Sequence, residues 1–138
     1  MLRKDFQHLA EERIRDAEAL LQANRYGAAR YLAGLAVECA IKARIAGQTR
    51  EHEFPDKQKA IDAHQHNLEK LLGIAGLSDA LTSEISTNPA FKGNWGTIRK
   101  WTVEWRYDPP ISESESTTFL QSITDPVDGI LSWLRAHW

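Results

Sequence analysis

The chain has 138 residues, of which 42% are hydrophobic and 26% are charged, a composition typical of one compact domain with an ordinary core. Its 17 basic and 19 acidic residues give a net charge of -2, which argues against a generally basic nucleic-acid coat and against an acidic disordered tail. The single cysteine, Cys39, excludes an intrachain disulfide framework and a zinc site built from several cysteines. We therefore expect residues 1–138 to form a single domain.

The sequence also lacks the hydrophobic segments that membranes and export require. No apolar run approaches the roughly 20 residues needed to span a bilayer. The first residues, MLRKDFQHLAEERIRD, have no apolar stretch of the kind found in signal peptides. These observations predict a cytoplasmic protein without membrane association.

Two long helices are predicted at the beginning of the chain. Residues 4–24 carry apolar side chains at intervals of three and four, which places them on one stripe of a helix. The next segment, YGAARYLAGLAVECAIKARIAG, consists mostly of helix-forming residues with small side chains, and Gly47 is a plausible stop. Because few residues join the two helices, we expect them to pack antiparallel.

The middle of the chain is predicted to contain a loop and two shorter helices. Residues 48–62 are polar and charged and are interpreted as a loop. A third helix starts near His64 and carries leucines at helical spacing. A fourth helix follows with Ser78 as its N-cap, and Asn88-Pro89 ends it.

The last third of the chain is rich in tryptophan. Residues 91–107 hold three of the five tryptophans at helical spacing, which predicts one helix pressed into the core. The segment ISESEST is interpreted as a loop. The final helix, residues 117–138, is either kinked at Pro126 or restarted there with Asp125 as N-cap. With no strand of alternating polarity, the sequence predicts an all-α protein.

Basic and acidic residues are distributed unevenly along the chain. Residues 1–46 and residues 88–108 each carry a net charge of +2, whereas the two remaining segments are acidic. If the second helix packs on the tryptophan helix, their cations could form a small anion site, namely Lys42, Arg44, Arg99, Lys100 and Arg106. The alternative is charge scattered over the surface, with little energetic effect.

Two charged residues interrupt the alanine-rich second helix. Glu38 and Lys42 have the i, i+4 spacing of a helical ion pair. A charge buried in such a helix requires a partner, because burying it alone costs several kcal/mol. Arg106 is the candidate partner for Glu38, which predicts a structural pair between these two residues.

No catalytic motif, metal site or cofactor site is predicted. The three histidines His52, His64 and His66 lie in or beside one loop, but they lack the convergent spacing and the cysteines of a zinc site. Cys39 is interpreted as a small core residue. The sequence contains no glycine-rich phosphate loop and no Gly-x-Ser-x-Gly or His-Glu-x-x-His motif.

The order of three segments resembles a known family. VECAIK in the second helix, HNLEKLL in the third and WRYDP after the tryptophans are similar in order and spacing to the HEPN domain, over about residues 4–134. The resemblance implies an up-and-down bundle of four to five helices, commonly a homodimer. The family includes ribonucleases, toxin partners of minimal nucleotidyltransferases in toxin-antitoxin pairs, and nucleotide-binding members without nuclease activity.

The ribonuclease motif of that family is incomplete in this chain. Ribonuclease members carry an arginine followed, after four to six residues, by a histidine that transfers protons. The matching arginine is Arg106, but no histidine follows it before His137. The missing histidine argues against ribonuclease activity, and we propose no catalytic residue.

The resemblance to the inactive branch of the family implies a ligand site of four residues. Lys42 and Arg106 would contact phosphates, Tyr107 would stack on a base, and His66 would donate a hydrogen bond. The function predicted on this basis is binding of a nucleotide or nucleic acid as a homodimer, with a nucleotidyltransferase as a candidate protein partner.

Two alternatives stay open. The first is a divergent ribonuclease that uses His64 or His66 in place of the absent histidine. The second is a pure protein-interaction and dimerisation module, built on the small-residue helix or the tryptophan helix.

Overall fold

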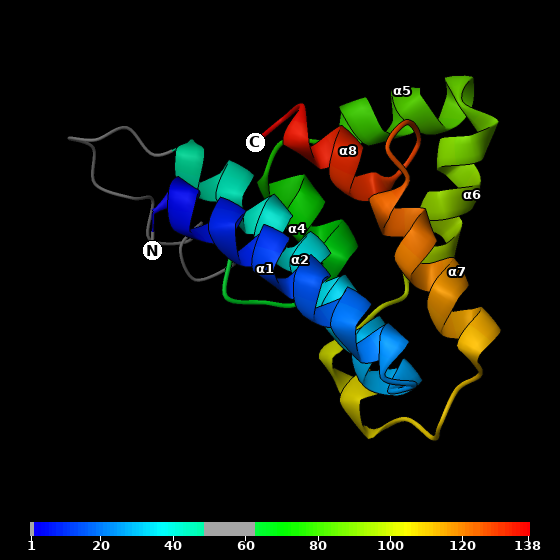
Figure 1. The fold of residues 1–138 in the computed structure, drawn as a ribbon. Helices are drawn as coiled ribbons and strands as arrows, with labels where there is room; N and C mark the ends of the chain where they lie inside the picture. Colours follow the sequence, from blue (N-terminus) through cyan, green and yellow to red (C-terminus); the bar gives the residue numbers. More distant parts are fainter. Residues whose placement is uncertain (1, 49–62) are drawn as a thin grey trace.

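The computed structural model describes residues 2–48 and 63–138, which contain seven α-helices, one 3₁₀ helix and no strand. The predicted all-α class is therefore confirmed. The family resemblance implies four to five helices, whereas the six helical segments predicted along the chain become seven α-helices and one 3₁₀ helix in these described residues, because the tryptophan segment and the C-terminal segment are each interrupted. The helices, labelled as in Figure 1, are α1 (Arg3–Gln22), α2 (Tyr26–Gly47), α4 (Leu68–Ile74), α5 (Ser78–Thr87), α6 (Pro89–Ile98), η1 (Val103–Tyr107), α7 (Glu113–Thr124) and α8 (Ile130–Arg135).

Helices α1 and α2 form the antiparallel pair that the sequence predicts (Figure 1). The apolar stripe of α1 buries Ala10, Ile14 and Ala17. The turn between the helices places Asn24 at a φ of 64°, a left-handed conformation that asparagine tolerates better than most residues.

Helix α2 is the centre of the molecule. It packs against α1, α4, α7, α8 and η1, and eleven of its residues are buried. Its small side chains permit close approach, most clearly at Gly34, where an added Cβ atom would lie 2.2 Å from the indole ring of Trp101. The Trp101 indole N–H also donates to the carbonyl of Tyr31 at 3.2 Å, which fixes the ring on α2.

The tryptophan segment is not the single helix predicted for residues 91–107. Helix α6 ends at Ile98, the chain becomes extended at Thr102 (φ -141°, ψ 162°), and η1 follows. The interruption allows Trp101 to enter the contact with Gly34 while Trp105 packs on Phe119 of α7, with ring centroids 5.6 Å apart. The two indoles therefore do not share one helical face.

The C-terminal region is also divided. The serine- and acid-rich segment predicted as a loop begins α7, because the Ser112 hydroxyl caps the helix by accepting from the backbone N–H of Glu115 at 3.0 Å. Helix α7 ends at Thr124, and Pro126 lies outside both helices. Asp125 does not cap α8, because the N-cap of that helix is Gly129. The Asp125 carboxylate instead accepts from the backbone N–H groups of Val127 and Asp128.

The short middle helices differ from the prediction at their starts. Helix α4 begins at Leu68 rather than near His64, and its N-cap is Asn67, whose side chain accepts from the backbone N–H of Lys70. Ser78 is the first residue of α5 and not its cap. The loop predicted over residues 48–62 lies almost entirely outside the described residues.

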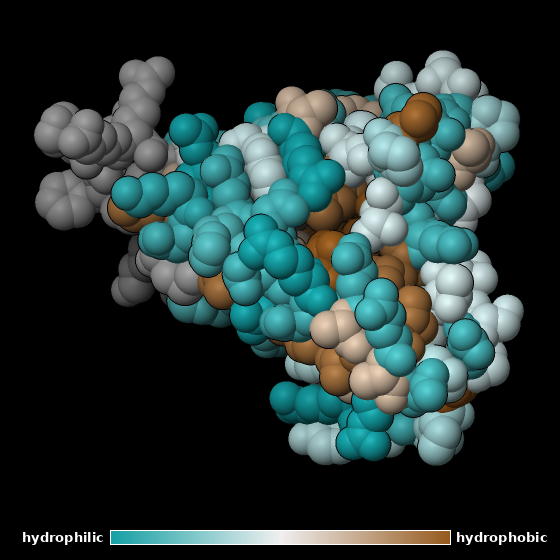
Figure 2. Space-filling view, in the orientation of Figure 1, coloured by the Kyte–Doolittle hydropathy of each residue, from teal (hydrophilic) through white to brown (hydrophobic). Residues whose placement is uncertain are grey.

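The buried hydrophobic side chains of the described residues form one cluster, to which α1, α2, α4, α6, α7 and α8 all contribute. Figure 2 shows hydrophilic side chains over α1, with hydrophobic ones visible in the seam between α1 and α7. None of the described helices is long and apolar enough to cross a membrane.

Candidate functional site

Two of the four residues predicted to bind a ligand are joined by Glu38. The Glu38 side chain is only 5% exposed, and its Oε2 lies 3.3 Å from the Lys42 ammonium. Its other oxygen, Oε1, lies 2.7 Å from Nδ1 of His66, the residue that precedes the N-cap of α4. The carboxylate therefore has two partners, which is how a buried charge is normally accommodated.

The predicted pair between Glu38 and Arg106 is not formed. Both residues lie in the described part of the chain, and no ion pair joins them. The one-turn spacing on α2 supplies Lys42, and the chain entering α4 supplies His66. Since Lys42 and His66 already satisfy Glu38, this cluster fastens the start of α4 to the central helix.

Cys39 lies beside this cluster, and its thiol is expected to be unreactive. Burial, and secondarily the neighbouring Glu38 carboxylate, raise the pKa of the Cys39 thiol to about 11. A thiol with that pKa is almost entirely protonated at neutral pH and is a poor nucleophile. The interpretation of Cys39 as a core residue is confirmed by its burial.

The other two predicted ligand residues lie on η1. The Arg106 guanidinium is 4.9 Å from the centre of the Tyr107 ring, and Tyr107 is 74% exposed. Neither residue contacts Lys42 or His66 through a hydrogen bond or ion pair among the described residues. The predicted four-residue site is thus divided between the Glu38 cluster and η1.

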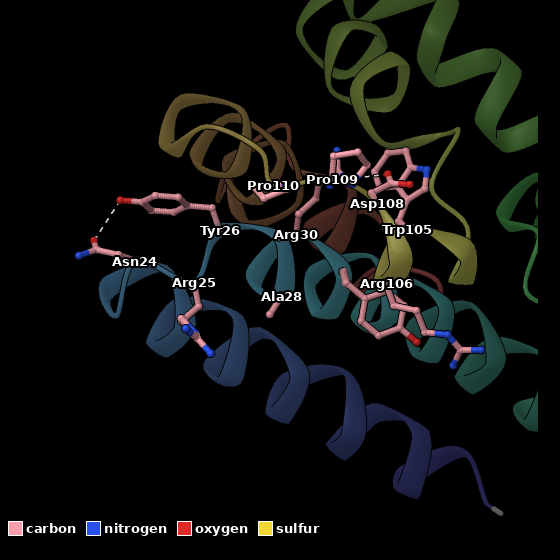
Figure 3. A pocket seen from close by; sticks show the side chains of 12 residues that line it. Asn24, Arg25, Tyr26, Ala28, Arg30, Trp105, Arg106, Asp108, Pro109 and Pro110 are labelled. Carbon is pink, nitrogen blue, oxygen red and sulfur yellow. Dashed lines mark hydrogen bonds and ion pairs between the residues drawn. The ribbon is translucent and has the colours of Figure 1, made fainter.

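Arg106 lines a pocket of about 440 Å³ at the start of α2, shown in Figure 3. We call it the arginine pocket, because Arg25, Arg30 and Arg106 all line it, together with a single carboxylate, Asp108. Its wall comes from the α1–α2 turn, the first turns of α2, the end of η1 and the segment that follows η1. The remaining lining residues are Asn24, Tyr26, Gly27, Ala28, Tyr31, Trp105, Pro109 and Pro110.

Arg30 is the most enclosed cation of this pocket, with 13% of its side chain exposed. Its guanidinium lies over the Trp105 ring, 4.1 Å from the ring centroid, a favourable cation–π arrangement. Its Nη2 donates to Asp108 Oδ2 at 2.9 Å. Its Nε is buried and has no hydrogen-bond partner.

The backbone at the start of α2 adds to the positive potential of the arginine pocket. The first turn of a helix has N–H groups without intrahelical partners, and here they belong to residues that line the pocket. The N-cap, Arg25, makes no capping hydrogen bond through its side chain, and the first turn contains no acidic residue. The positive end of the 22-residue helix dipole is therefore not compensated from within the helix, and the carboxylate that lies near it, Glu113 beside Tyr26, comes from α7.

A second cavity, of about 310 Å³, lies next to the arginine pocket and shares Arg30 and Trp105 with it. Its other lining residues come from α6 and α7, and most are polar: Thr97, Ser114, Glu115, Thr118 and Phe119. Arg30 and Trp105 therefore form a partition between two hollows in the surface.

The basic residues expected to gather only partly do so. Arg44 donates to the carbonyls of Ala75 and His137, and Arg99 pairs with Glu69, so both serve packing between helices. Sequence reasoning did not single out Arg25 and Arg30. The signal available in the sequence is the break at Asn24 and Gly27 between the two long helices, which places both arginines at the start of α2, the end of the helix that η1 approaches.

The structure gives no support to a metal centre. No group of three or more potential metal ligands occurs among residues 2–48 and 63–138. His64 and His66, the two histidines of the predicted loop that are described, lie on an exposed stretch before α4, and His52 lies outside the described residues.

Comparison with protein-family models, with curated proteins and with solved structures finds no match to this chain.

Proposed function

We propose that this chain is a non-catalytic binding domain that holds the phosphate of a nucleotide or nucleic acid in the arginine pocket. The observation that carries the proposal is that Arg25, Arg30 and Arg106 line one pocket that has a single carboxylate, Asp108, in its wall. Three cations and one anion leave an excess of positive charge in a chain whose total charge is negative.

The chemistry of the lining suits a phosphorylated aromatic ligand. Guanidinium groups bind phosphate through paired N–H donors, and the first turn of α2 presents further N–H groups. Tyr26, Tyr31 and Trp105 supply aromatic surface beside these donors, and Tyr107 is exposed next to Arg106. Aromatic side chains of this kind stack on bases.

We also propose that the domain is of the HEPN type, acts as a homodimer and is a partner of a nucleotidyltransferase in a toxin-antitoxin pair. The resemblance of VECAIK, HNLEKLL and WRYDP to that family supports this, and the three segments lie in α2, at α4 and in η1. Light scattering tests the dimer: the proposal expects twice the monomer mass at micromolar concentration, and a monomer at high micromolar concentration contradicts it.

A thermal-shift series tests ligand binding. We expect millimolar ATP, GTP or a short RNA to raise the unfolding temperature, and Arg106→Ala to reduce that rise. Lys92→Ala is the matched control, because Lys92 is exposed on α6 and does not line the pocket. The proposal fails if no ligand shifts the transition, or if both variants respond like the wild type.

One observation favours a second candidate function, a divergent ribonuclease. The buried Glu38 carboxylate holds Nδ1 of His66 at 2.7 Å, while 49% of the His66 side chain is exposed. A carboxylate that fixes one ring nitrogen leaves the other as a positioned proton acceptor. Cleavage of labelled RNA by the wild type and by His64→Ala, but not by His66→Ala, would establish this function; equal cleavage by all three, or none, would rule it out.

A further inference from the structure

Arg30 contains a hydrogen-bond donor that the fold leaves unused. Its Nε has no partner, although the atom is buried and 13% of the side chain is exposed. A buried donor without an acceptor costs free energy, so native structures rarely contain one without a reason. Arg30 lines both neighbouring cavities, but its Nε has no accessible surface, so an acceptor reaches this atom only after a neighbouring side chain moves away.

The unused donor belongs to a two-pronged edge of the guanidinium. Nε–H and one N–H of Nη2 point in the same direction, and an anion with two oxygens can bridge them. Asp108 reaches only one prong, since its Oδ2 accepts from Nη2 at 2.9 Å and Nε is left unpaired. The aspartate thus leaves Nε–H, one of the two donors of this edge, without an acceptor.

We propose that this edge of Arg30 is the phosphate-binding site of the arginine pocket. Asp108 occupies part of this site in the absence of ligand, and a ligand phosphate displaces it. The inference rests on the proposed function and adds to it the residue that receives the phosphate and the residue that competes with it. A phosphate brings more acceptor oxygens than Asp108 uses, and it can satisfy Nε and Nη2 together. The stacked Trp105 ring keeps the guanidinium plane in place during the exchange.

Asp108 is situated where such an exchange requires little rearrangement. Its side chain is 40% exposed, and it follows directly after η1, outside any helix. When it leaves, its carboxylate regains water, whereas the enclosed Arg30 gains the bridging anion. The exchange therefore replaces a single hydrogen bond to Arg30 with a bidentate contact that uses both Nε–H and Nη2.

The test is calorimetric titration of ATP into the full chain and four variants, Arg106→Ala among them. Asp108→Asn removes the competing charge, and we expect it to tighten ATP binding about fivefold, the effect of one partly exposed ion pair. Glu104→Gln removes the same charge from η1 at an exposed residue that does not line the pocket, and it should change affinity less than about twofold. Arg30→Lys keeps the charge but loses the paired donors, so it should weaken binding about tenfold.

The outcomes separate this inference from the proposed function. Suppose that Arg106→Ala weakens ATP binding, but that Asp108→Asn tightens it no more than Glu104→Gln does. In that case the displacement of Asp108 by phosphate is refuted, whereas the proposal that the arginine pocket binds the ligand is retained. If neither the wild type nor Asp108→Asn binds ATP, both proposals are overturned. Thermal unfolding identifies variants that fail to fold. The Arg30 Nε–H resonance gives a second readout in the wild type, because it should shift when ATP is added. If this resonance stays unchanged at saturating ATP, Arg30 is not the phosphate-binding residue.

Discussion

The contact between Gly34 and Trp101 shows how a single missing side chain positions η1. A Cβ atom at residue 34 would lie 2.2 Å from the indole, and the ring cannot yield easily because its N–H is bound to the Tyr31 carbonyl. Trp101 therefore packs against α2 at this position because Gly34 has no side chain. Displacement of the ring would also move η1, which carries Trp105 and Arg106 into the arginine pocket.

We predict that Gly34→Ala destabilises the chain by about 1–3 kcal/mol, the usual cost of adding an atom to a packed interior. Gly96→Ala is the matched control, because an added Cβ on α6 would meet nothing within 4 Å. Alanine is a better helix former, so this control should be neutral or stabilising by up to about 1 kcal/mol. Urea denaturation of both variants decides the matter, and equal effects would contradict the packing explanation.

Cys39 leads to a prediction about chemical reactivity. Because burial raises the pKa of its thiol to about 11, the native protein should resist iodoacetamide at pH 8 and react readily once unfolded. The free energy of unfolding should be unaffected by this thiol below its ordinary pKa of 9.0 and should fall as the pH rises from there toward 11. Mass spectrometry after a short labelling pulse measures the reactivity; rapid native labelling would show that the thiol is accessible.

At the scale of elements, the connection between α7 and α8 is a turn organised by one carboxylate. The backbone N–H groups of Asp128 and Val127 donate to Asp125 and hold the pKa of that carboxyl below its ordinary value of 3.8. Gly129 then starts α8, in a space where a Cβ atom would lie 2.4 Å from the Asp125 carbonyl. The turn permits α8 to fold back onto the core despite Pro126.

This turn predicts a specific dependence on pH. A lowered pKa in the folded state means that the ionised carboxylate stabilises the fold above pH 3.8 and that this contribution is lost as the pH falls through the lowered pKa. Asp125→Asn should therefore be less stable than the wild type at pH 7, and the difference should shrink toward pH 2. Denaturation curves across this range provide the measurement, and a difference that does not vary with pH would refute the role of the charge.

The helices show which features of the fold can be predicted from sequence. The positions of α1 and α2 follow from their own periodicity and composition, and the i, i+4 spacing of Glu38 and Lys42 is sufficient to predict their contact. The break between Ile98 and Val103 is decided by Trp101 fitting against Gly34, a contact between distant parts of the chain. Periodicity within one segment contains no information about that contact.

The same reasoning explains the partial success with the site. Arg106 can be singled out because it lies in WRYDP, and it does line the arginine pocket. Arg30 resembles any surface arginine in the sequence, and only the approach of Trp105 and Asp108 encloses it. The family resemblance implies that His66 and Lys42 face a ligand, but both meet Glu38. Lys42 does so because it lies one turn further along α2, and His66 does so because α4 packs on α2.

At the scale of the whole molecule, charge is distributed in a way that the total does not reveal. A net charge of -2 coexists with a pocket lined by three arginines and one aspartate. The pocket forms because the central helix begins at the same end of the molecule where η1 terminates. Its location, and not the average charge, determines which ligands the surface attracts.

The most direct test of the central claim is to locate bound ATP by nuclear magnetic resonance. We predict that ATP shifts the backbone N–H signals of Gly27 and Ala28 and the Nε–H signal of Arg30, with little change around His66. Shifts centred on His66 and Lys42, or no shifts at millimolar ATP, would contradict the assignment of the arginine pocket as the phosphate-binding site.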